Sequence, residues 1–489
     1  MTDIFTRKNI ASSIFFRVVL DFCKNSVIII SQNTSEVKSV FRLIMLKRKI
    51  LSKLTEWKNS RPEKCLIVEG ARQIGKTFII REFAKENYES QIELNFIENP
   101  SLSDIFKGAL DSESVLTAVT LYVPDSKIIP GNTLLFIDEI QECSEAITAL
   151  KFLAADSRID VICSGSALGM SYKPQTSYPV GSVEYLKMTA LDFEEFLWAL
   201  NVDENIIFSL KKLFDDKDCK SKVPFAVHEK MNSLLRQYLV LGGMPEVVQN
   251  FVDNKDYRSA DTIQRRLYKD YLYDIARYAK PDIKIKAERC YKSIPLQLTK
   301  ENHKFQYGVV EHKATSSKYE SSVDWLVNAH IAVSVNNLRA TEYPLKAFSV
   351  EENFRIYPTD ISFLICTYGY EIKSALLNDK KIEERPDDII LSTAKGGIYE
   401  ALAADMLYKS GHENLNFYRS EKGTPEIEFF VENEDGVIPV EIKAGRTGTK
   451  SLNTVLENDN IKYGYKFASQ NIGKSGKKIT MPLYMLMFL

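Results

Sequence analysis

Continuous apolar runs recur in the first half of the chain, each followed by turn residues. They include Cys65–Val68, Leu134–Ile137 and the apolar start of "IDVICSGSALG" (159–169). Runs of this length are typical of parallel strands that are covered on both faces. Because a helical pattern follows the first run, we predict an α/β domain with a doubly wound parallel sheet.

Residues 190–290 show a helical period instead. "DFEEFLWAL" and "LLRQYLVLGG" carry apolar residues at helical spacing, and Gly242-Gly243 followed by Pro245 marks a turn. We expect these leucine and aromatic stripes to be part of a hydrophobic core.

The segment "QRRLYKDYLYDIARYAKPDIKIK" (264–286) mixes tyrosines with basic residues. Such a mixture can hold a nucleic-acid backbone. Asp270 and Asp274 dilute the charge, however, and a solvated amphipathic helix gives the same pattern. We favour the solvated helix.

Residues 293–338 combine helical patterns with a strand. "SIPLQLTKENHKFQYGVV" and "SSVDWLVNAHIAVSVNNL" fit a small winged-helix-like module. That fold often binds DNA, but the fold alone does not establish a function.

A helix and a hairpin are predicted near the C-terminus. "KGGIYEALAADMLYKSG" (395–411) has a helical pattern, and "EIEFFVENEDGVIPVEIKAG" (426–445) reads as two strands around a turn at 433–436. If Glu432 is opposite Val437, one hairpin face is apolar. The other face then carries Glu428 directly opposite Glu441, together with Lys443.

The N-terminal 44 residues differ from the rest. Their apolar stretch is interrupted by charges and is a poor membrane span or signal peptide, so we expect a poorly ordered extension. From Met45, "MLKRKILSKLTEWKN" predicts an amphipathic helix, with Leu46, Ile50, Leu54 and Trp57 on one face.

Composition bears on the number of domains, on the partners and on the cellular compartment. The 489 residues allow two to four domains, and a net charge of −1 argues against bulk attraction to nucleic acid or membranes. Seven cysteines without a Cys-x-x-Cys pair fit reduced thiols in a cytoplasmic protein, and the five histidines are too dispersed to suggest a metal site.

A phosphate-binding loop is the strongest chemical signal. In "CLIVEGARQIGKTFIIREFAKE" (65–86) a buried strand runs into Gly-x-x-x-x-Gly-Lys-Thr, and a helix follows. Such a loop points backbone N–H groups at phosphates, while its lysine reaches the β- and γ-phosphates and its threonine ligates Mg²⁺. We predict that ATP and Mg²⁺ bind here, with nucleotide contacts from Gly70, Ala71, Arg72, Gln73, Ile74, Gly75, Lys76, Thr77 and Phe78.

Two acids end the next apolar strand, in "NTLLFIDEIQ" (132–141). Ligands gather at the carboxyl ends of parallel strands, so Asp138 is expected to join Thr77 in holding Mg²⁺. Glu139 is expected to activate the attacking water as a general base, and Lys76 to act with it in catalysis. At the end of the third strand, Ser164 or Ser166 is a candidate γ-phosphate contact.

These motifs together resemble the prokaryotic AAA-type ATPases that carry a C-terminal domain of unknown function. The resemblance rests on "GARQIGKT", "LLFIDEIQ", "SGSALG", "VEYLKMTALDFEEFLWAL" and "YLVLGGMPEVVQNFV", and it extends from about Met45 to the C-terminus. It implies an ATPase domain (45–200), a helical lid (201–290), a winged-helix-like region (291–370) and a restriction-endonuclease-like domain (371–489).

One position departs from the relatives. Ser182 stands where they tend to carry a basic residue, and an arginine finger is worth orders of magnitude in phosphoryl-transfer rate. We therefore expect slow hydrolysis. Arg72 and Arg158 are other basic candidates near the site.

The opposed carboxylates in the C-terminal hairpin also carry chemistry. Like charges directly opposite each other are destabilising unless solvent, a proton or a cation intervenes. The spacing is similar to the PD-(D/E)xK nuclease motif, with Glu428, Glu441 and Lys443 in its positions and Glu400 as an accessory acid. A solvated hairpin face is the plain alternative.

The leading hypothesis is an ATP-binding protein of the AAA type, a slow Mg²⁺-dependent ATPase in which nucleotide switches the C-terminal domain. One alternative is an ATP-regulated, metal-dependent DNA nuclease. Another is a non-enzymatic, nucleotide-gated regulator that binds DNA or protein. DNA is thus a candidate partner, a membrane is not, and oligomerisation is left open.

Overall fold

The computed structural model describes residues 17–21, 26–30, 46–60, 63–166, 179, 181–300, 303–378, 389–421, 423–443 and 450–489. The chain forms two compact units, Met1–Lys47 and Arg48–Leu489. In the first, strands β1 (Arg17–Asp21) and β2 (Ser26–Ile30) pair antiparallel. The rest of the expected N-terminal extension lies outside the described residues.

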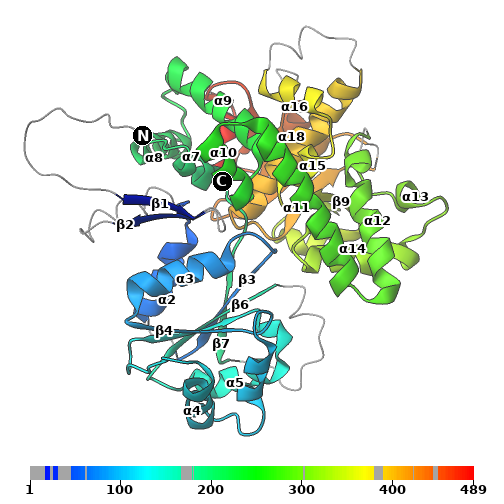
Figure 1. Ribbon diagram of the computed structural model, residues 1–489. Coiled ribbons are helices and arrows are strands. Elements are labelled where there is room, and N and C mark those ends of the chain that lie inside the picture. The colour runs from blue at the N-terminus through cyan, green and yellow to red at the C-terminus, as the bar shows by residue number, and fades with distance from the viewer. Residues whose placement is uncertain are drawn as a thin grey trace, which may run out of the picture. The chain divides into compact units, whose positions relative to one another are not determined.

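The second unit begins with a five-stranded sheet (Figure 1). Its order is β4-β5-β6-β3-β7 and every printed pairing is parallel. This confirms the predicted α/β domain with a parallel sheet. The strands are β3 (Cys65–Gly70), β4 (Ser90–Asn95), β5 (Thr133–Asp138), β6 (Asp160–Ser166) and β7 (Val183–Lys187).

Helices accompany this sheet along the chain. The first, α2, buries Ile50, Leu54 and Trp57, three of the four residues predicted for its apolar face. The helices are α2 (Ile50–Ser60), α3 (Lys76–Asn87), α4 (Ser112–Tyr122) and α5 (Ser144–Leu153), with short 3-10 helices η1 (Pro100–Phe106) and η2 (Ile140–Glu142).

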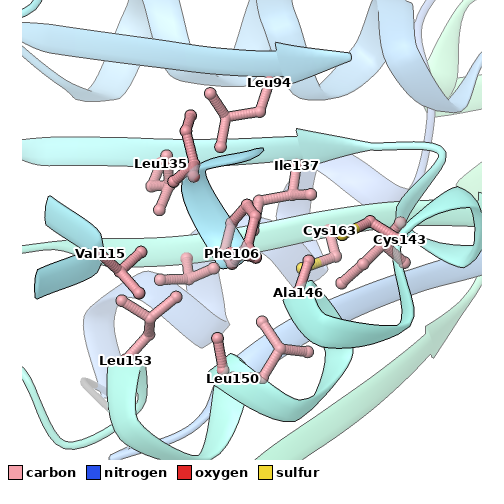
Figure 2. Packing of buried hydrophobic residues seen from close by; sticks show 14 of the residues in the cluster. Leu94, Phe106, Val115, Leu135, Ile137, Cys143, Ala146, Leu150, Leu153 and Cys163 are labelled. Carbon is pink, nitrogen blue, oxygen red and sulfur yellow. The ribbon is translucent and has the colours of Figure 1, made fainter. Parts of the chain in front are cut away.

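The core of this domain packs one face of the sheet against helices α4 and α5 (Figure 2). Leu135 and Ile137 from β5 meet Val115 from α4 and Leu150 from α5, and all four are buried. Since every residue of β5 is buried, its unbroken apolar run reflects covering on both faces.

A largely helical region follows, as the period of residues 190–290 predicted. Pro245 begins one of its helices directly after the Gly242-Gly243 turn. The helices are α7 (Phe193–Ala199), α8 (Glu204–Asp215), α9 (Phe225–Leu241), α10 (Pro245–Asn254), α11 (Tyr257–Tyr278), α12 (Pro281–Leu298), α13 (Tyr307–Val310) and α14 (Ser316–Asn328).

The strands expected in a winged-helix-like module belong instead to a large C-terminal sheet. This eight-stranded sheet has the order β14-β15-β13-β12-β11-β10-β8-β9. The boundary expected at residue 370 therefore cuts through one sheet, since β8 pairs parallel with β10. Its strands are β8 (Ala332–Leu338), β9 (Ser349–Pro358), β10 (Leu415–Arg419), β11 (Glu426–Asn433), β12 (Gly436–Ile442), β13 (Gly464–Ala468), β14 (Gly473–Ser475) and β15 (Lys478–Pro482).

The C-terminal hairpin has the predicted register. Glu432 pairs with Val437 and Phe429 with Val440, so that Glu428 lies across from Glu441. The accompanying elements are η3 (Leu345–Phe348), α15 (Ile361–Ile365), α16 (Tyr370–Leu377), α18 (Ile389–Lys409), α19 (Lys450–Val455) and η4 (Leu483–Phe488).

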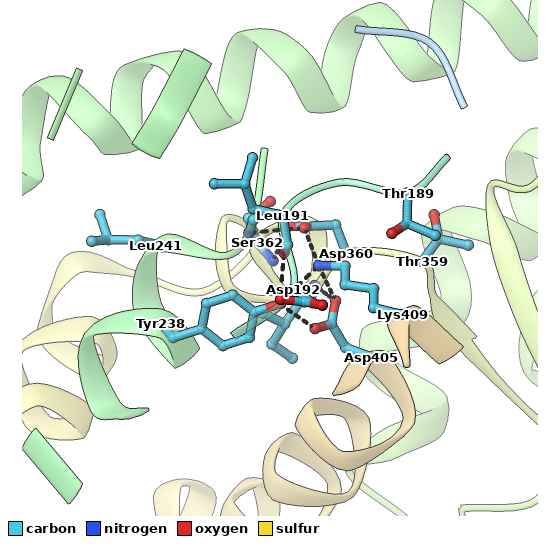
Figure 3. A network of polar contacts seen from close by, with 12 residues as sticks. Thr189, Leu191, Asp192, Tyr238, Leu241, Thr359, Asp360, Ser362, Asp405 and Lys409 are labelled. Atoms are coloured by element: carbon cyan, nitrogen blue, oxygen red, sulfur yellow. Dashed lines mark hydrogen bonds and ion pairs between the residues drawn. The ribbon is translucent and has the colours of Figure 1, made fainter. Parts of the chain in front are cut away.

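Two of the family-like motifs meet at a buried polar network (Figure 3). The amide of Leu191 donates to the carbonyl of Gly243 at 2.8 Å. A Cβ on Gly243 would lie 1.9 Å from the carbonyl oxygen of Leu191, so only glycine fits. Beside them, Lys409 donates to Asp360 at 2.7 Å and to Tyr238 at 2.9 Å.

This network joins the segment after β7, at Leu191, to helices α9 and α18. The Tyr238 hydroxyl donates to Asp405 at 2.8 Å, and Asp405 accepts the ammonium of Lys409 at 2.8 Å. Burial raises the pKa of Asp405 to about 6, although Lys409 counteracts it. One buried cation therefore balances two buried carboxylates, those of Asp360 and Asp405.

Candidate functional site

The phosphate loop connects β3 to α3, at the carboxyl edge of the first sheet. Gly70 has φ +154°, and a Cβ there would lie 2.1 Å from the carbonyl oxygen of Met188. Gly75 precedes the helix with φ +93°. Both glycines are thus required by backbone geometry.

Lys76 lies inside this loop. Its side chain is 7% exposed, and its ammonium donates to the carbonyls of Gly70 at 3.0 Å and Ala71 at 2.7 Å. Burial lowers its pKa to about 8, against the opposing influence of Glu139 and Asp138. A buried ammonium group at the N-terminus of a helix is well placed to bind an anionic phosphate.

Asp138 is the centre of a polar cluster at the ends of three strands and of α3. The Thr77 hydroxyl donates to it at 3.0 Å, the Asn95 amide donates at 3.1 Å, and the Ser164 hydroxyl donates as well. Burial raises the pKa of Asp138. Thr77 and Asp138 are therefore adjacent, as a shared Mg²⁺ site requires.

Asn95 was missed by the reasoning from sequence. It ends β4 directly beside Asp138, the last residue of β5. A polar residue at the end of a neighbouring strand was the available signal. Ser166 pairs through its backbone with Gly70 at the end of β6, and its side chain is outside the described residues.

Glu139 follows β5 in a left-handed conformation, with φ 54°. The Gln141 amide donates to its carboxylate, and Gln141 itself is 2% exposed with a buried carbonyl oxygen that has no protein partner. Gln141 thus fixes the direction of the Glu139 carboxylate. The side-chain carbonyl oxygen of Gln141 is an unpaired hydrogen-bond acceptor beside Glu139.

The remaining loop residues face different surroundings. The carbonyl of Ile74 accepts the guanidinium of Arg48 at 3.1 Å, and Phe78 is 54% exposed on α3. Arg48 also lines a cavity of about 540 Å³, together with Lys53 and Thr189. A cavity of that volume can hold a small organic ligand.

Helix α11 contacts the phosphate loop through several polar side chains. Arg72 donates to Asp274 at 2.9 Å and to the Tyr278 hydroxyl, and its guanidinium lies 4.6 Å from the centroid of that ring. The Tyr271 hydroxyl donates to the Arg72 carbonyl at 2.8 Å, and Gln73 donates to Asp270 at 3.2 Å. Arg72 is therefore held by α11.

Ser182 and Arg158, the other two positions considered for a catalytic cation, lie away from the loop. Ser182 precedes β7, where its carbonyl accepts the amide of Cys65 at 2.9 Å. That is the opposite end of the sheet, roughly 16 Å from Gly70 along β3. Arg158 precedes β6 at the same edge and pairs with Asp156 and Glu113. Arg158 was therefore wrongly expected near the phosphates.

The C-terminal carboxylates form a second polar cluster. Lys443 lies 3.1 Å from Glu428 and 3.4 Å from Glu441. Burial raises the pKa of Glu428 to about 7, and Oε2 of the 1% exposed Glu441 has no hydrogen-bond partner. One buried carboxylate oxygen thus lacks a hydrogen-bond donor, although the ammonium of Lys443 lies near the same carboxylate.

Glu400 is occupied by other partners. It accepts hydrogen bonds from Arg355, Tyr357 and His303, the last at 2.5 Å. Although burial raises it, these contacts, chiefly the charge of Arg355, hold its pKa down at about 2. Within the described ranges, no three His, Cys, Asp or Glu side chains gather in a way that could hold a metal ion.

Family comparisons divide the chain into three matched regions. Residues 62–197 match an AAA domain, residues 232–373 match a domain of unknown function (DUF8612), and residues 395–482 match another (DUF4143). No curated protein matches the chain. None of the helices that the structure describes has the length and apolar character needed to cross a membrane.

Two solved structures that the chain is similar to are distant. The Walker-type ATPase PABY2304 of Pyrococcus abyssi is 14% identical, covering 66% of this chain and 96% of its own, with a TM-score of 0.39. PCH-2 of C. elegans is 12% identical, covering 41% and 61%, with a TM-score of 0.25. At such scores neither structure informs the fold of this chain. The AAA match, which contains the phosphate loop, identifies residues 62–197 as a P-loop ATPase domain.

Proposed function

We propose that the chain binds ATP with Mg²⁺ at the phosphate loop and hydrolyses it slowly. The observation that carries this proposal is Lys76, buried inside a glycine-shaped loop beside the contacting pair Thr77 and Asp138. The AAA match over residues 62–197 supports it.

Each group has a role in this proposal. The loop amides and Lys76 bind the phosphates, and Thr77 and Asp138 would hold Mg²⁺, which neutralises charge on the phosphate oxygens when bound. Glu139, oriented by Gln141, accepts a proton from the attacking water. The cavity beside Arg48 takes the nucleoside part.

Slow turnover is part of the proposal. Transition-state charge is commonly stabilised by a second cation, worth orders of magnitude in rate. Arg72 is the arginine of the loop itself, but Asp274 and Tyr278 hold its guanidinium. Release of Arg72 from α11 would then accompany activation and would pass the nucleotide state to the rest of the chain.

Three variants test this function. Lys76→Ala should weaken ATP binding at least tenfold by calorimetry, and Glu139→Gln should bind ATP but release little phosphate. The matched control Lys85→Ala changes an exposed lysine on the same helix and should leave both readouts unchanged. Normal ATP binding and turnover in Lys76→Ala would overturn the proposal.

A second candidate function is metal-dependent cleavage of nucleic acid at the C-terminal cluster. The buried Oε2 of Glu441, which has no hydrogen-bond partner, favours this function. A divalent cation there would balance the negative charges of both Glu441 and Glu428. The residues fit a cation held by two carboxylates, with Lys443 beside it. Glu400 does not join them, since its oxygens are taken.

Binding of Mn²⁺, read from the electron paramagnetic signal of the free ion, tests this site apart from activity. Glu441→Gln should lose one bound ion, while Glu457→Gln, at an exposed position, should keep it. DNA nicking that depends on Glu441 would support cleavage. Unchanged metal binding in Glu441→Gln would refute the site.

A further inference from the structure

Helix α11 presents acidic and basic side chains to different surroundings. Its three acids face partners in the protein: Asp261 pairs with Lys373, Asp270 accepts from Gln73, and Asp274 accepts from Arg72. Two of these partners belong to the phosphate loop. The acids that dilute the charge in the sequence are therefore engaged by the protein.

The outward face of α11 is basic. Its exposed positions, all described by the structure, contain no acid: Arg258, Thr262, Arg265, Arg266, Lys269, Tyr273, Ala276 and Arg277. The spacings of three, four and seven residues place them along one stripe. Arg266 also contacts Glu246 from α10 and lies 3.7 Å from Asp270, and Arg265 contacts Asp261. Arg258, Lys269 and Arg277 are the stripe's other cations.

An exposed aromatic interrupts this stripe. Tyr273 is 72% exposed and lies between Lys269 and Arg277, four residues from each. From Arg258 to Arg277 the helix spans about 28 Å at 1.5 Å per residue. A row of cations with an open aromatic ring is the pattern by which proteins hold a nucleic-acid strand.

We propose that the outward face of α11 is a docking surface for single-stranded nucleic acid. The cations contact the sugar–phosphate backbone and Tyr273 stacks on a base. A membrane surface fits poorly, because amphipathic membrane helices insert a row of large apolar residues. On this face Tyr273 is the one large ring.

The surface is tested by fluorescence anisotropy of a labelled 20-nucleotide DNA strand with the full chain, in 50 to 200 mM KCl and without ATP. Lys269→Glu/Arg277→Glu should weaken binding at least tenfold and flatten the salt dependence, because two phosphate contacts are lost. Tyr273→Ala should weaken binding several-fold. Since no nucleotide is present, the result does not depend on the ATPase proposal.

A matched control distinguishes the effect of this surface on DNA binding from the effect of overall charge. Lys151→Glu/Lys230→Glu makes the same charge change at exposed positions on α5 and α9 and should alter the affinity less than twofold. Equal losses in both double variants, or unchanged binding in Lys269→Glu/Arg277→Glu, would overturn the proposal. Melting temperatures within a few degrees of wild type establish that all variants are folded.

Discussion

At the scale of single residues, Lys76 links nucleotide affinity to pH. Its pKa in the free protein is lowered to about 8 by burial, and a bound phosphate would raise it. Above pH 8, where Lys76 of the free protein loses its proton, ATP binding is then accompanied by proton uptake at Lys76. We predict that ATP affinity is constant from pH 6.5 to 7.5 and falls above pH 8, approaching tenfold per pH unit.

Calorimetry in buffers of different ionisation enthalpy measures this effect, since proton uptake appears as a buffer-dependent heat. The Lys76→Arg variant is the control, because arginine stays charged throughout. An affinity that is flat to pH 9.5 in the wild type would contradict the prediction.

At the scale of elements, α11 restrains the phosphate loop through Arg72. We predict that Asp274→Ala raises ATP affinity by roughly fivefold, because a part-buried ion pair is worth about 1 kcal/mol and its loss leaves the guanidinium held only by its contacts with Tyr278. It also removes an acid beside the loop. Titration with a fluorescent ATP analogue gives the affinity.

The comparison is Asp282→Ala, which removes an exposed acid from the next helix, α12, and should leave the affinity unchanged. A weaker affinity in Asp274→Ala would mean that α11 supports the ATP-binding form of the loop.

The buried network around Lys409 is also an element-scale feature. Replacing Lys409 by methionine leaves Asp360 and Asp405 buried without their cation. We predict a loss of about 3–5 kcal/mol in the free energy of unfolding, measured in urea. Lys230→Met, at an exposed position of α9, should change it by less than about 0.5 kcal/mol.

At the scale of the whole molecule, α11 contacts the phosphate loop through Asp270 and Asp274 and presents its cations outward. If both proposed ligands bind, they share this helix, and their coupling must be reciprocal. We predict that Mg²⁺–ATP changes the affinity for single-stranded DNA, and that DNA changes the affinity for ATP by the same factor.

Both titrations can be made on the Glu139→Gln variant, so that hydrolysis does not disturb equilibrium. Asp274→Ala should reduce the coupling, since it removes the ion pair between Arg72 and α11. Coupling that is undiminished in that variant would show that another route joins the two sites.

Local patterns were enough for much of the fold and of the nucleotide site. The apolar runs predicted the central strands β3, β5 and β6, because a parallel strand is buried on both faces wherever it lies. The phosphate loop needed only its own residues. The hairpin register followed from a short turn and a period of two, which placed Glu428 across from Glu441.

Tertiary structure decided what depends on distant partners. Pairing of β8 with β10 joins Asn336 to Asn416, and no local period encodes a contact across that separation. Glu400 is held by Arg355 from another element, so its role could not be read from its spacing. Asp270 and Asp274 likewise contact the phosphate loop, about 200 residues earlier in the chain, and that contact leaves the cations of α11 facing outward.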